Sequence, residues 1–277
     1  MSTNPGGLWK ASYGEVGATL KALQDHGVST EHLARLRAEP DYAKRVAEFM
    51  LSGRTSGSVN HQVARAILGK NFFGVEAWTA LYGVKFTKKQ LREVAEFPRG
   101  EDVLNAPCPF VKGKTVKETH FAFLGLKNVN GKPLTILNLQ EMHPQNGQPK
   151  FASYAPDSRY SKESWATSKT AKFRWYLMLL EIVPNFEFKT YHQKQMTMLP
   201  QGYEVPTAVE EVLKDILYYR KNGIYLNPNW YAQTTDVITS SGRRVHVGRF
   251  SSFGLDIGSF WDDFRLGNVG PGASRKS

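Results

Sequence analysis

The sequence predicts an α+β protein in two parts: a small helical domain over residues 1–97, followed by a domain of short antiparallel strands and one or two helices over residues 98–277. Three observations favour this organisation. Apolar residues recur at helical spacing in the first third, strand-like apolar runs begin after residue 97, and one amphipathic helix is expected after Pro206. The composition, 41% hydrophobic and 22% charged, is typical of globular proteins and argues against disorder of the whole chain.

The first third is expected to be helical. Val16, Leu20 and Leu23 recur at helical spacing, and Pro40 predicts the beginning of another helix. The polar stretch 51–60 predicts a hinge or loop. Two helices joined by a turn have the outline of a helix-turn-helix, but the second helix offers few side chains that could read base edges, so DNA binding is the weaker interpretation.

The next two thirds carry strand and turn signals. Phe121–Leu124 and Leu134–Leu137 flank Asn130-Gly131, which predicts a hairpin. Phe173–Leu180 is a dense apolar run and predicts a buried strand.

The best-marked helix follows Pro206. Apolar residues line one face of it, and the basic end before Gly223 is typical of a helix stop. After it, Val237 and Val245 bracket Ser241-Gly242, which predicts a final hairpin.

No catalytic motif was found in the sequence. Serine-nucleophile elbows, Walker loops, dinucleotide-binding glycine motifs and kinase motifs are missing, and the seven histidines have no metal-ligand spacing. The single cysteine, Cys108, excludes an intrachain disulfide and is expected to pack in the core. We therefore expect no metal, no cofactor and no enzymatic activity. A hydrolase or transferase that uses His143, Asp157 or His246 stays open as an alternative.

The net charge of +11 favours an anionic partner. Its densest runs, Lys85–Arg92 and Lys112–Lys117, are interpreted as solvated faces or loops, and a nucleic-acid-associated protein is kept as the alternative function. No apolar run is long enough to span a membrane and no signal peptide is present, which predicts a cytoplasmic protein and leaves surface display open.

The final forty residues have an unusual composition. Residues 234–274 contain no Lys, Glu, Gln or Met and a single Trp, Trp261, although these types are common elsewhere in the chain. The same stretch interleaves Phe with Ser, Gly, Asp and Asn. Adaptable binding surfaces use this mixture, because rings give contact area at low entropic cost and small polar residues give adjustable hydrogen bonds. The tail is therefore interpreted as a recognition surface.

This tail resembles the C-termini of the variable proteins of diversity-generating retroelements, which occur in uncultured bacteria with small genomes. The resemblance is carried by Val245, Gly248, Phe250, Gly254, Leu255, Trp261-Asp262-Asp263, Arg265, Val269-Gly270 and Ala273-Ser274-Arg275-Lys276. It implies a C-type-lectin-like fold for residues 98–277, related to the formylglycine-generating enzymes. It also implies a hypervariable region in which an error-prone reverse transcriptase changes adenines. The chemistry of those enzymes is not expected, because it needs two cysteines.

The resemblance implies a binder of a protein or other macromolecule that presents a diversified C-terminal loop. The expected scaffold residues are Trp261, Arg265 and Gly270. The expected ligand-binding residues lie between and before them: Phe253, Asp256, Ser259, Phe260, Phe264, Leu266 and Asn268. The alternative for the three phenylalanines is a place in the core, which would remove the recognition surface.

Overall fold

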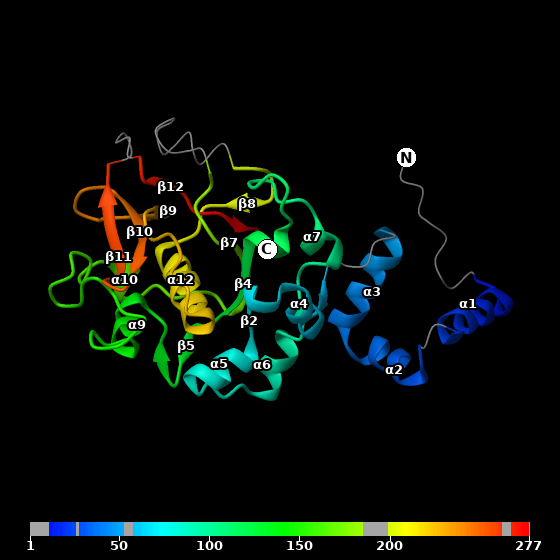
Figure 1. Cartoon of the computed structure of the whole chain (residues 1–277). Helices are drawn as coiled ribbons and strands as arrows, with labels where there is room; N and C mark the ends of the chain where they lie inside the picture. The colour runs from blue at the N-terminus through cyan, green and yellow to red at the C-terminus, as the bar shows by residue number, and fades with distance from the viewer. Residues whose placement is uncertain (1–10, 26–27, 53–57, 185–198, 262–266, 277) are drawn as a thin grey trace. The chain divides into compact units, whose positions relative to one another are not determined.

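The computed structural model describes residues 11–25, 28–52, 58–184, 199–261 and 267–276. It divides into two compact units, Met1–Ser56 and Gly57–Ser277. The first unit contains three helices among its described residues (Figure 1): α1 (Tyr13–Asp25), α2 (Thr30–Ala38) and α3 (Pro40–Ser52). In α2 the N–H of Ser29 donates to Nδ1 of His32, a reciprocal cap that fixes the beginning of the helix. The helices expected in this region are confirmed.

The second unit begins with short elements and continues with longer ones. Up to residue 142 these are β1 (Val59–Asn60), α4 (His61–Leu68), β2 (Phe72–Phe73), α5 (Val75–Tyr82), α6 (Lys88–Glu93), β3 (Glu96–Phe97), α7 (Glu101–Asn105), α8 (Val116–Thr119), β4 (His120–Gly125), β5 (Asn128–Val129), β6 (Lys132–Pro133) and α9 (Ile136–Met142). The later elements are α10 (Ser164–Thr167), β7 (Arg174–Leu179), β8 (Tyr203–Glu204), α12 (Ala208–Asn222), β9 (Tyr231–Val237), β10 (Arg244–Ser251), β11 (Gly254–Phe260), β12 (Val269–Pro271) and β13 (Ser274–Arg275). A mixed α+β fold is confirmed.

Two sheets organise the second unit. The five-stranded sheet has the order β2-β4-β7-β13-β8, and the four-stranded sheet has the order β11-β10-β9-β12. β10 pairs antiparallel with both β9 and β11, so the hairpin predicted around Ser241-Gly242 is confirmed. The expected strand Phe173–Leu180 is also confirmed, as β7. β11 has a neighbouring strand on one side only and is therefore an edge of its sheet.

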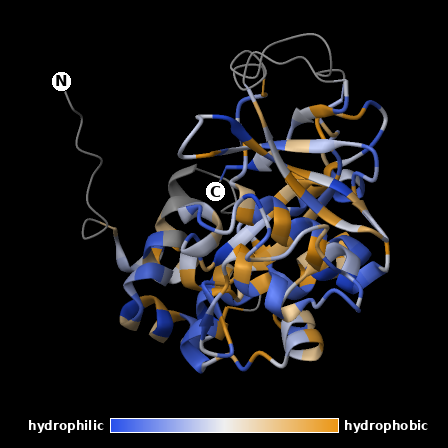
Figure 2. Ribbon diagram, turned by 90° about the vertical axis from the view of Figure 1, so that its left-hand side faces the viewer, coloured by the Kyte–Doolittle hydropathy of each residue, from blue (hydrophilic) through white to orange (hydrophobic). Residues whose placement is uncertain are grey.

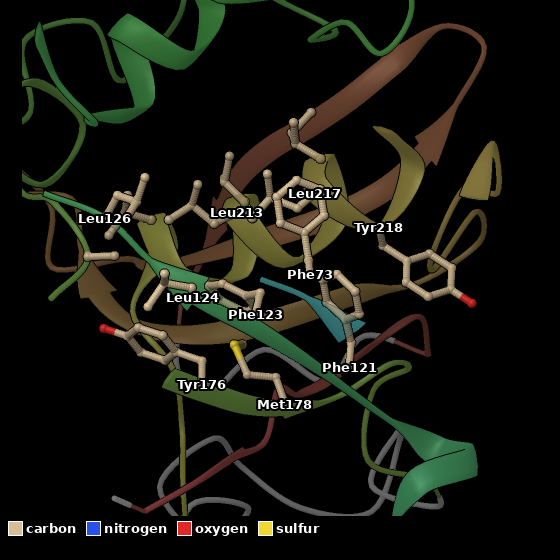
Figure 3. Packing of buried hydrophobic residues seen from close by; sticks show 14 of the residues in the cluster. Phe73, Phe121, Phe123, Leu124, Leu126, Tyr176, Met178, Leu213, Leu217 and Tyr218 are labelled. Carbon is tan, nitrogen blue, oxygen red and sulfur yellow. The ribbon is translucent and has the colours of Figure 1, made fainter. Parts of the chain in front are cut away.

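Helix α12 packs against strands of both sheets. It contacts β4 and β2 of the five-stranded sheet and β9 and β10 of the four-stranded sheet. The rings of Tyr218 in α12 and Phe121 in β4 pack edge to face with centroids 5.2 Å apart. Figure 3 shows Leu213 and Leu217 of α12 in the same buried cluster. In Figure 2 the hydrophobic segments gather in the interior of this unit. The helix predicted after Pro206 is confirmed, and Gly223 ends it in the left-handed conformation with φ 67°.

The predicted domain boundary after residue 97 differs from the observed division after Ser56. Residues 57–97 belong to the second unit because their rings complete its core. β2 pairs in parallel with β4, and Nε1 of Trp78 donates to the carbonyl oxygen of Leu124 at 2.8 Å. Nε1 of Trp175 likewise donates to the carbonyl oxygen of Val94. A pattern of short helices gave no sign of these long-range contacts.

The turn predicted at Asn130-Gly131 is confirmed, but the two strands predicted to flank it are not paired with each other. Both residues have positive φ, 51° and 82°, as such a turn requires, but the turn joins only β5 and β6. β4 pairs instead with β7. The expected strand Leu134–Leu137 runs into helix α9, because the hydroxyl of Thr135 accepts the N–H of Asn138 and caps the helix.

Two further expectations concern single features. Cys108 is buried, as expected for a core cysteine. Among the described residues, none of the helices combines the length and the apolar character that crossing a bilayer needs.

Candidate functional site

β11 presents its two faces to different surroundings. Leu255 and Ile257 are buried in the main hydrophobic core. On the other face of the strand, Asp256 is half-buried and Phe260 is exposed. Side chains alternate along a strand, so this pattern is typical of a sheet with one buried face. The sequence Gly254–Phe260 thus anchors the strand through one face and displays side chains on the other.

The first residues of β11 are held by a neighbouring segment. The N–H of Leu255 donates to the carbonyl oxygen of Lys150 at 2.8 Å, and the N–H of Ala152 donates to the carbonyl oxygen of Leu255 at 3.0 Å. Gly254 makes this approach possible: its φ is 117°, and an added Cβ would lie 2.4 Å from the carbonyl carbon of Phe151. Glycine is required here for both the dihedral angle and the space.

A hollow of about 350 Å³ lies beside β11. We call it the β11 hollow. It is lined by Ala152, Ser153, Asp157 and Arg159, by Tyr231 and His246, and by β11 from Asp256 to Phe260. Residues separated by about a hundred positions in the sequence therefore meet at the edge of the four-stranded sheet.

Three rings are packed together in this hollow. The centroids of Tyr231 and His246 are 4.5 Å apart with the planes at 76°, and those of His246 and Phe260 are 4.5 Å apart with the planes at 6°. Gly258 leaves the space for this packing, since an added Cβ would lie 2.6 Å from Nε2 of His246. The phenyl ring of Phe260 is thus supported from one side and 37% exposed.

His246 is neutral at physiological pH. It is 2% exposed, and burial lowers the pKa of its imidazole from 6.5 to about 3. A base with so low a pKa is poorly matched to proton transfer near pH 7. The ring of His246 acts here as a packed platform beneath Phe260.

A hydrogen bond fixes Asp256. The hydroxyl of Tyr231 donates to Oδ2 of Asp256 at 2.5 Å, and burial together with this carboxylate raises the pKa of Tyr231 to about 12. The phenol therefore stays protonated and holds the carboxylate in place. The hollow contains two carboxylates, Asp157 and Asp256, and one guanidinium, Arg159. The guanidinium of Arg249 also hydrogen-bonds the Tyr231 side chain, so two carboxylates and two guanidiniums lie in and next to this hollow.

The structure brings three of the predicted ligand-binding residues together. Asp256, Ser259 and Phe260 line the β11 hollow. Phe253 lies in the turn before β11 and is 85% exposed. Asn268 is half-buried, and its carbonyl oxygen accepts the N–H of Tyr231. Two further predicted ligand-binding residues, Phe264 and Leu266, lie outside the described residues.

The predicted scaffold residues have different surroundings. Gly270 is buried in β12, where an added Cβ would lie 3.0 Å from Cδ1 of Ile182. Trp261 directly follows β11 and is 53% exposed. The third scaffold residue, Arg265, lies outside the described residues.

The residues of the alternative enzymatic hypothesis are only partly brought together. Asp157 and His246 both line the β11 hollow, which His143 does not line. Nδ1 of His143 bonds the carbonyl oxygen of Leu139 at 2.8 Å, Nε2 bonds the hydroxyl of Tyr82, and burial lowers the pKa of the imidazole to about 4. Both ring nitrogens of His143 are thus used within the fold.

Sequence reasoning missed Tyr231 and Arg159 as members of the site. Tyr231 enters it through the pairing of β9 with β10, and Arg159 through the contact of residues 150–152 with β11. Neither residue stands in a motif, so no local signal could have identified them.

A second hollow of about 510 Å³ lies between α10 and β9. Nζ of Lys169 pairs there with Oδ1 of Asp236 at 2.6 Å, and Oδ2 of Asp236 accepts the N–H of Ala208. Asp236 thereby satisfies a backbone donor at the beginning of α12. These polar groups serve the fold.

Among the described residues, no group of three or more His, Cys, Asp or Glu side chains is arranged to hold a metal ion. Comparison of the chain with protein-family models, with curated proteins and with solved structures found no match.

Proposed function

We propose that the chain is a ligand-binding protein whose recognition surface is formed by β11, the turn before it and the residues that follow it. The observation that carries this proposal is the display of three large apolar side chains along one short segment: Phe253 is 85%, Phe260 37% and Trp261 53% exposed. Large apolar side chains left exposed along one short segment are typical of interaction sites and costly without a partner.

One face of β11 is buried, and this supports a recognition surface on the opposite face whose side chains can vary. Leu255 and Ile257 anchor the strand in the core, while Phe253, Asp256 and Phe260 point away from it. Substitution at exposed positions changes stability by about 0.5 kcal/mol or less. A binder of this kind accepts new side chains at the surface without refolding, as a diversity-generating retroelement requires of its variable protein.

The proposal includes a C-type-lectin-like arrangement of the second unit. It is supported by the final strands β9, β10 and β11, which form an antiparallel sheet on one long helix, α12, and by β13, which returns to pair with β7. The pairing of β2 with β4 extends this domain to residues before 98.

The proposal is tested with two libraries in the full-length chain. One randomises Phe253, Asp256 and Phe260, and the matched control randomises Leu255 and Ile257 of the same strand. We expect most members of the first library and few of the second to resist proteolysis, because only the second disturbs the core. Equal losses in both libraries would contradict the proposal.

The retroelement origin has its own test in the genome. We expect a near-copy of the codons for residues 250–270 beside a reverse-transcriptase gene, differing from them only at adenines. Differences spread over all four bases would contradict this origin and leave the binding surface itself unaffected.

A nucleic acid is the competing ligand class, because the chain carries a net charge of +11. The full-length chain and a variant with Phe253, Phe260 and Trp261 replaced by serine are titrated with single-stranded DNA over a range of salt concentrations. Binding that weakens steeply with salt and persists in the variant would favour the nucleic-acid function over the proposed one.

A further inference from the structure

Helix α1 exposes all of its large apolar side chains. Tyr13, Val16, Leu20 and Leu23 follow one another at intervals of three, four and three residues, and no residue of this helix, all of which is described, is buried. Tyr13 is 99% exposed, and the other three side chains are between 38% and 44% exposed. We call these four residues the α1 seam. A helix of 13 residues is only marginally stable by itself in water, so a partner on the seam stabilises it.

The spacing of the seam is that of a coiled coil. In a heptad written abcdefg, Tyr13 and Leu20 take position a, and Val16 and Leu23 take position d. Side chains at a and d of one helix insert between the corresponding side chains of a matching helix. The seam therefore indicates a second helix as its partner.

The charged side chains of α1 have their partners within or next to the helix itself. Oε2 of Glu15 accepts the N–H and the hydroxyl of Ser12, both at 2.8 Å. Nζ of Lys21 lies 3.4 Å from Oδ2 of Asp25. These three charged residues take positions c, b and f of the heptad, which lie away from the seam. The helix satisfies its own charges and needs a partner only for its apolar side.

The residues that flank the seam are uncharged. Positions e and g are occupied by Gly17 and Gln24 and by Ser12 and Thr19. Charged residues at e and g set the choice of partner in coiled coils, by attracting opposite charges and repelling like charges. Two copies of α1 bring no like charges together at these positions, and no charge there selects a different helix.

The charge of α1 argues against an anionic partner. The helix carries two carboxylates, Glu15 and Asp25, and one ammonium group, Lys21, in a chain whose net charge is +11. Helices that lie on anionic membranes or bind nucleic acid carry Lys and Arg on the polar side. The basic character of the chain therefore does not extend to α1.

We propose that the α1 seam pairs with the α1 seam of a second copy of this chain, so that the protein forms a homodimer through its N-terminal unit. Two identical seams are self-complementary about a two-fold axis. Two heptads bury a small area, so the dimer is reversible and its fraction rises with protein concentration. This inference goes beyond the proposed function, because it concerns a different part of the chain.

Dimerisation changes what the chain can recognise. A dimer carries two copies of the proposed recognition surface, one from each chain. When a target presents the same site repeatedly, binding of the first copy raises the effective concentration of the second. A weak recognition surface then gains avidity without any new contact.

The test measures the oligomeric state of the full-length chain by sedimentation velocity over a wide range of concentration. Leu20→Glu places a charge within the seam. Ala18→Glu is the matched control, because it adds the same charge at position f, an exposed position on the opposite side of α1. We expect the dissociation constant of the dimer to rise by about tenfold or more in Leu20→Glu and by less than about twofold in Ala18→Glu.

Hydrogen exchange gives a second readout in the unchanged chain, which does not depend on whether Leu20→Glu keeps α1 folded. We expect the amides of the last two turns of α1 to exchange about tenfold more slowly in the dimer than in the monomer, because pairing opposes local unfolding of the helix.

Three results would overturn the inference. One is a chain that stays monomeric at every concentration, and another is a dimer that Leu20→Glu leaves intact. The third is equal protection of the α1 amides at all concentrations, because the seam would then be covered within a single chain. Phe253→Ser and Phe260→Ser are expected to leave the dimer unchanged, so failure of the dimer and failure of the recognition surface are detected separately.

Discussion

The imidazole of His246 and the phenyl ring of Phe260 lie nearly parallel, with centroids 4.5 Å apart and planes inclined by 6°. His246 is buried and neutral, while Phe260 remains partly exposed above it. The pair therefore links the core of the four-stranded sheet to the proposed recognition surface. Phe253, at the other end of β11, has no comparable ring contact among the described residues and is 85% exposed.

This difference predicts unequal effects of substitution. We expect Phe253→Ser to change the free energy of unfolding by about 0.5 kcal/mol or less, and Phe260→Ser to lower it by about 1 kcal/mol through loss of the ring stack. Phe250→Ala is the control: Phe250 is fully buried against Tyr219 and Tyr225, and its loss should cost about 3–5 kcal/mol. Chemical denaturation measures all three, and a destabilising Phe253→Ser would contradict the assignment of an exposed ring.

A cluster of buried charged residues in α12 predicts that two substitutions within it change the free energy of unfolding by different amounts. Glu211, Lys214 and Asp215 are completely buried, and Nζ of Lys214 pairs with Oε1 of Glu211 and lies 3.7 Å from Oδ1 of Asp215. Burial raises the pKa of Asp215 well above its usual value, which shifts its carboxyl toward the protonated form.

Removing one partner of the cluster should therefore have unequal costs. We expect Lys214→Met to lower the free energy of unfolding by about 3–5 kcal/mol, because it leaves a buried carboxylate without its cation. Asp215→Asn resembles the protonated acid and should change it by less than about 1 kcal/mol. Urea denaturation at pH 7 compares the two variants, and a costly Asp215→Asn would show that the carboxyl of Asp215 is ionised.

Buried histidines predict the pH dependence of stability. Burial lowers the pKa of His143 from 6.5 to about 4, so between these values the unfolded chain binds a proton that the folded chain does not. Stability contributed by this residue is present above pH 6.5 and is lost as the pH falls.

The measurement compares His143→Gln with the unchanged chain between pH 6.5 and 4. We expect the slope of the unfolding free energy against pH to be smaller in the variant by about 1.4 kcal/mol per pH unit, one proton's contribution. Ala152→Ser, at an exposed position, serves as a control that keeps the slope. Equal slopes for His143→Gln and the unchanged chain would mean that His143 titrates normally in the folded state.

The sequence predicted the parts of the fold whose signals are local. Helix α12 follows from Pro206, its apolar face and Gly223, and the β9–β10 hairpin follows from Ser241-Gly242. The parts that depend on distant partners were not predictable in this way. Phe72 and Phe73 form a strand only because β4 lies beside them, so the boundary after residue 97 was misplaced.

The same distinction applies to the candidate site. Asp256, Ser259 and Phe260 stand within one short stretch of unusual composition and were predicted as neighbours. Arg159 and Tyr231 reach the hollow through the bonds of residues 150–152 to β11 and through the order of the strands. Such contacts arise from tertiary structure. No local pattern in the sequence indicates them, and no motif marks the residues that make them.

Gly254 provides the last prediction, because it controls one wall of the β11 hollow. Its φ of 117° disfavours any other residue, and an added Cβ would lie within 2.6 Å of three backbone atoms of Phe151 and Ala152. Gly242 is the matched control, with a positive φ of 71° and no atom within 4 Å of an added Cβ. The two glycines share a left-handed backbone and differ in crowding.

We expect Gly242→Ala to lower the free energy of unfolding by about 1 kcal/mol from backbone strain alone, and Gly254→Ala to lower it by about 3 kcal/mol or more. The larger loss reflects displacement of residues 150–152, whose hydrogen bonds to Leu255 close the first part of the edge. Hydrogen exchange at the Leu255 and Ala152 amides should therefore accelerate in Gly254→Ala and stay unchanged in Gly242→Ala. Equal destabilisation by both substitutions would mean that residues 150–152 do not pack against β11, and the hollow beside it would lose its wall.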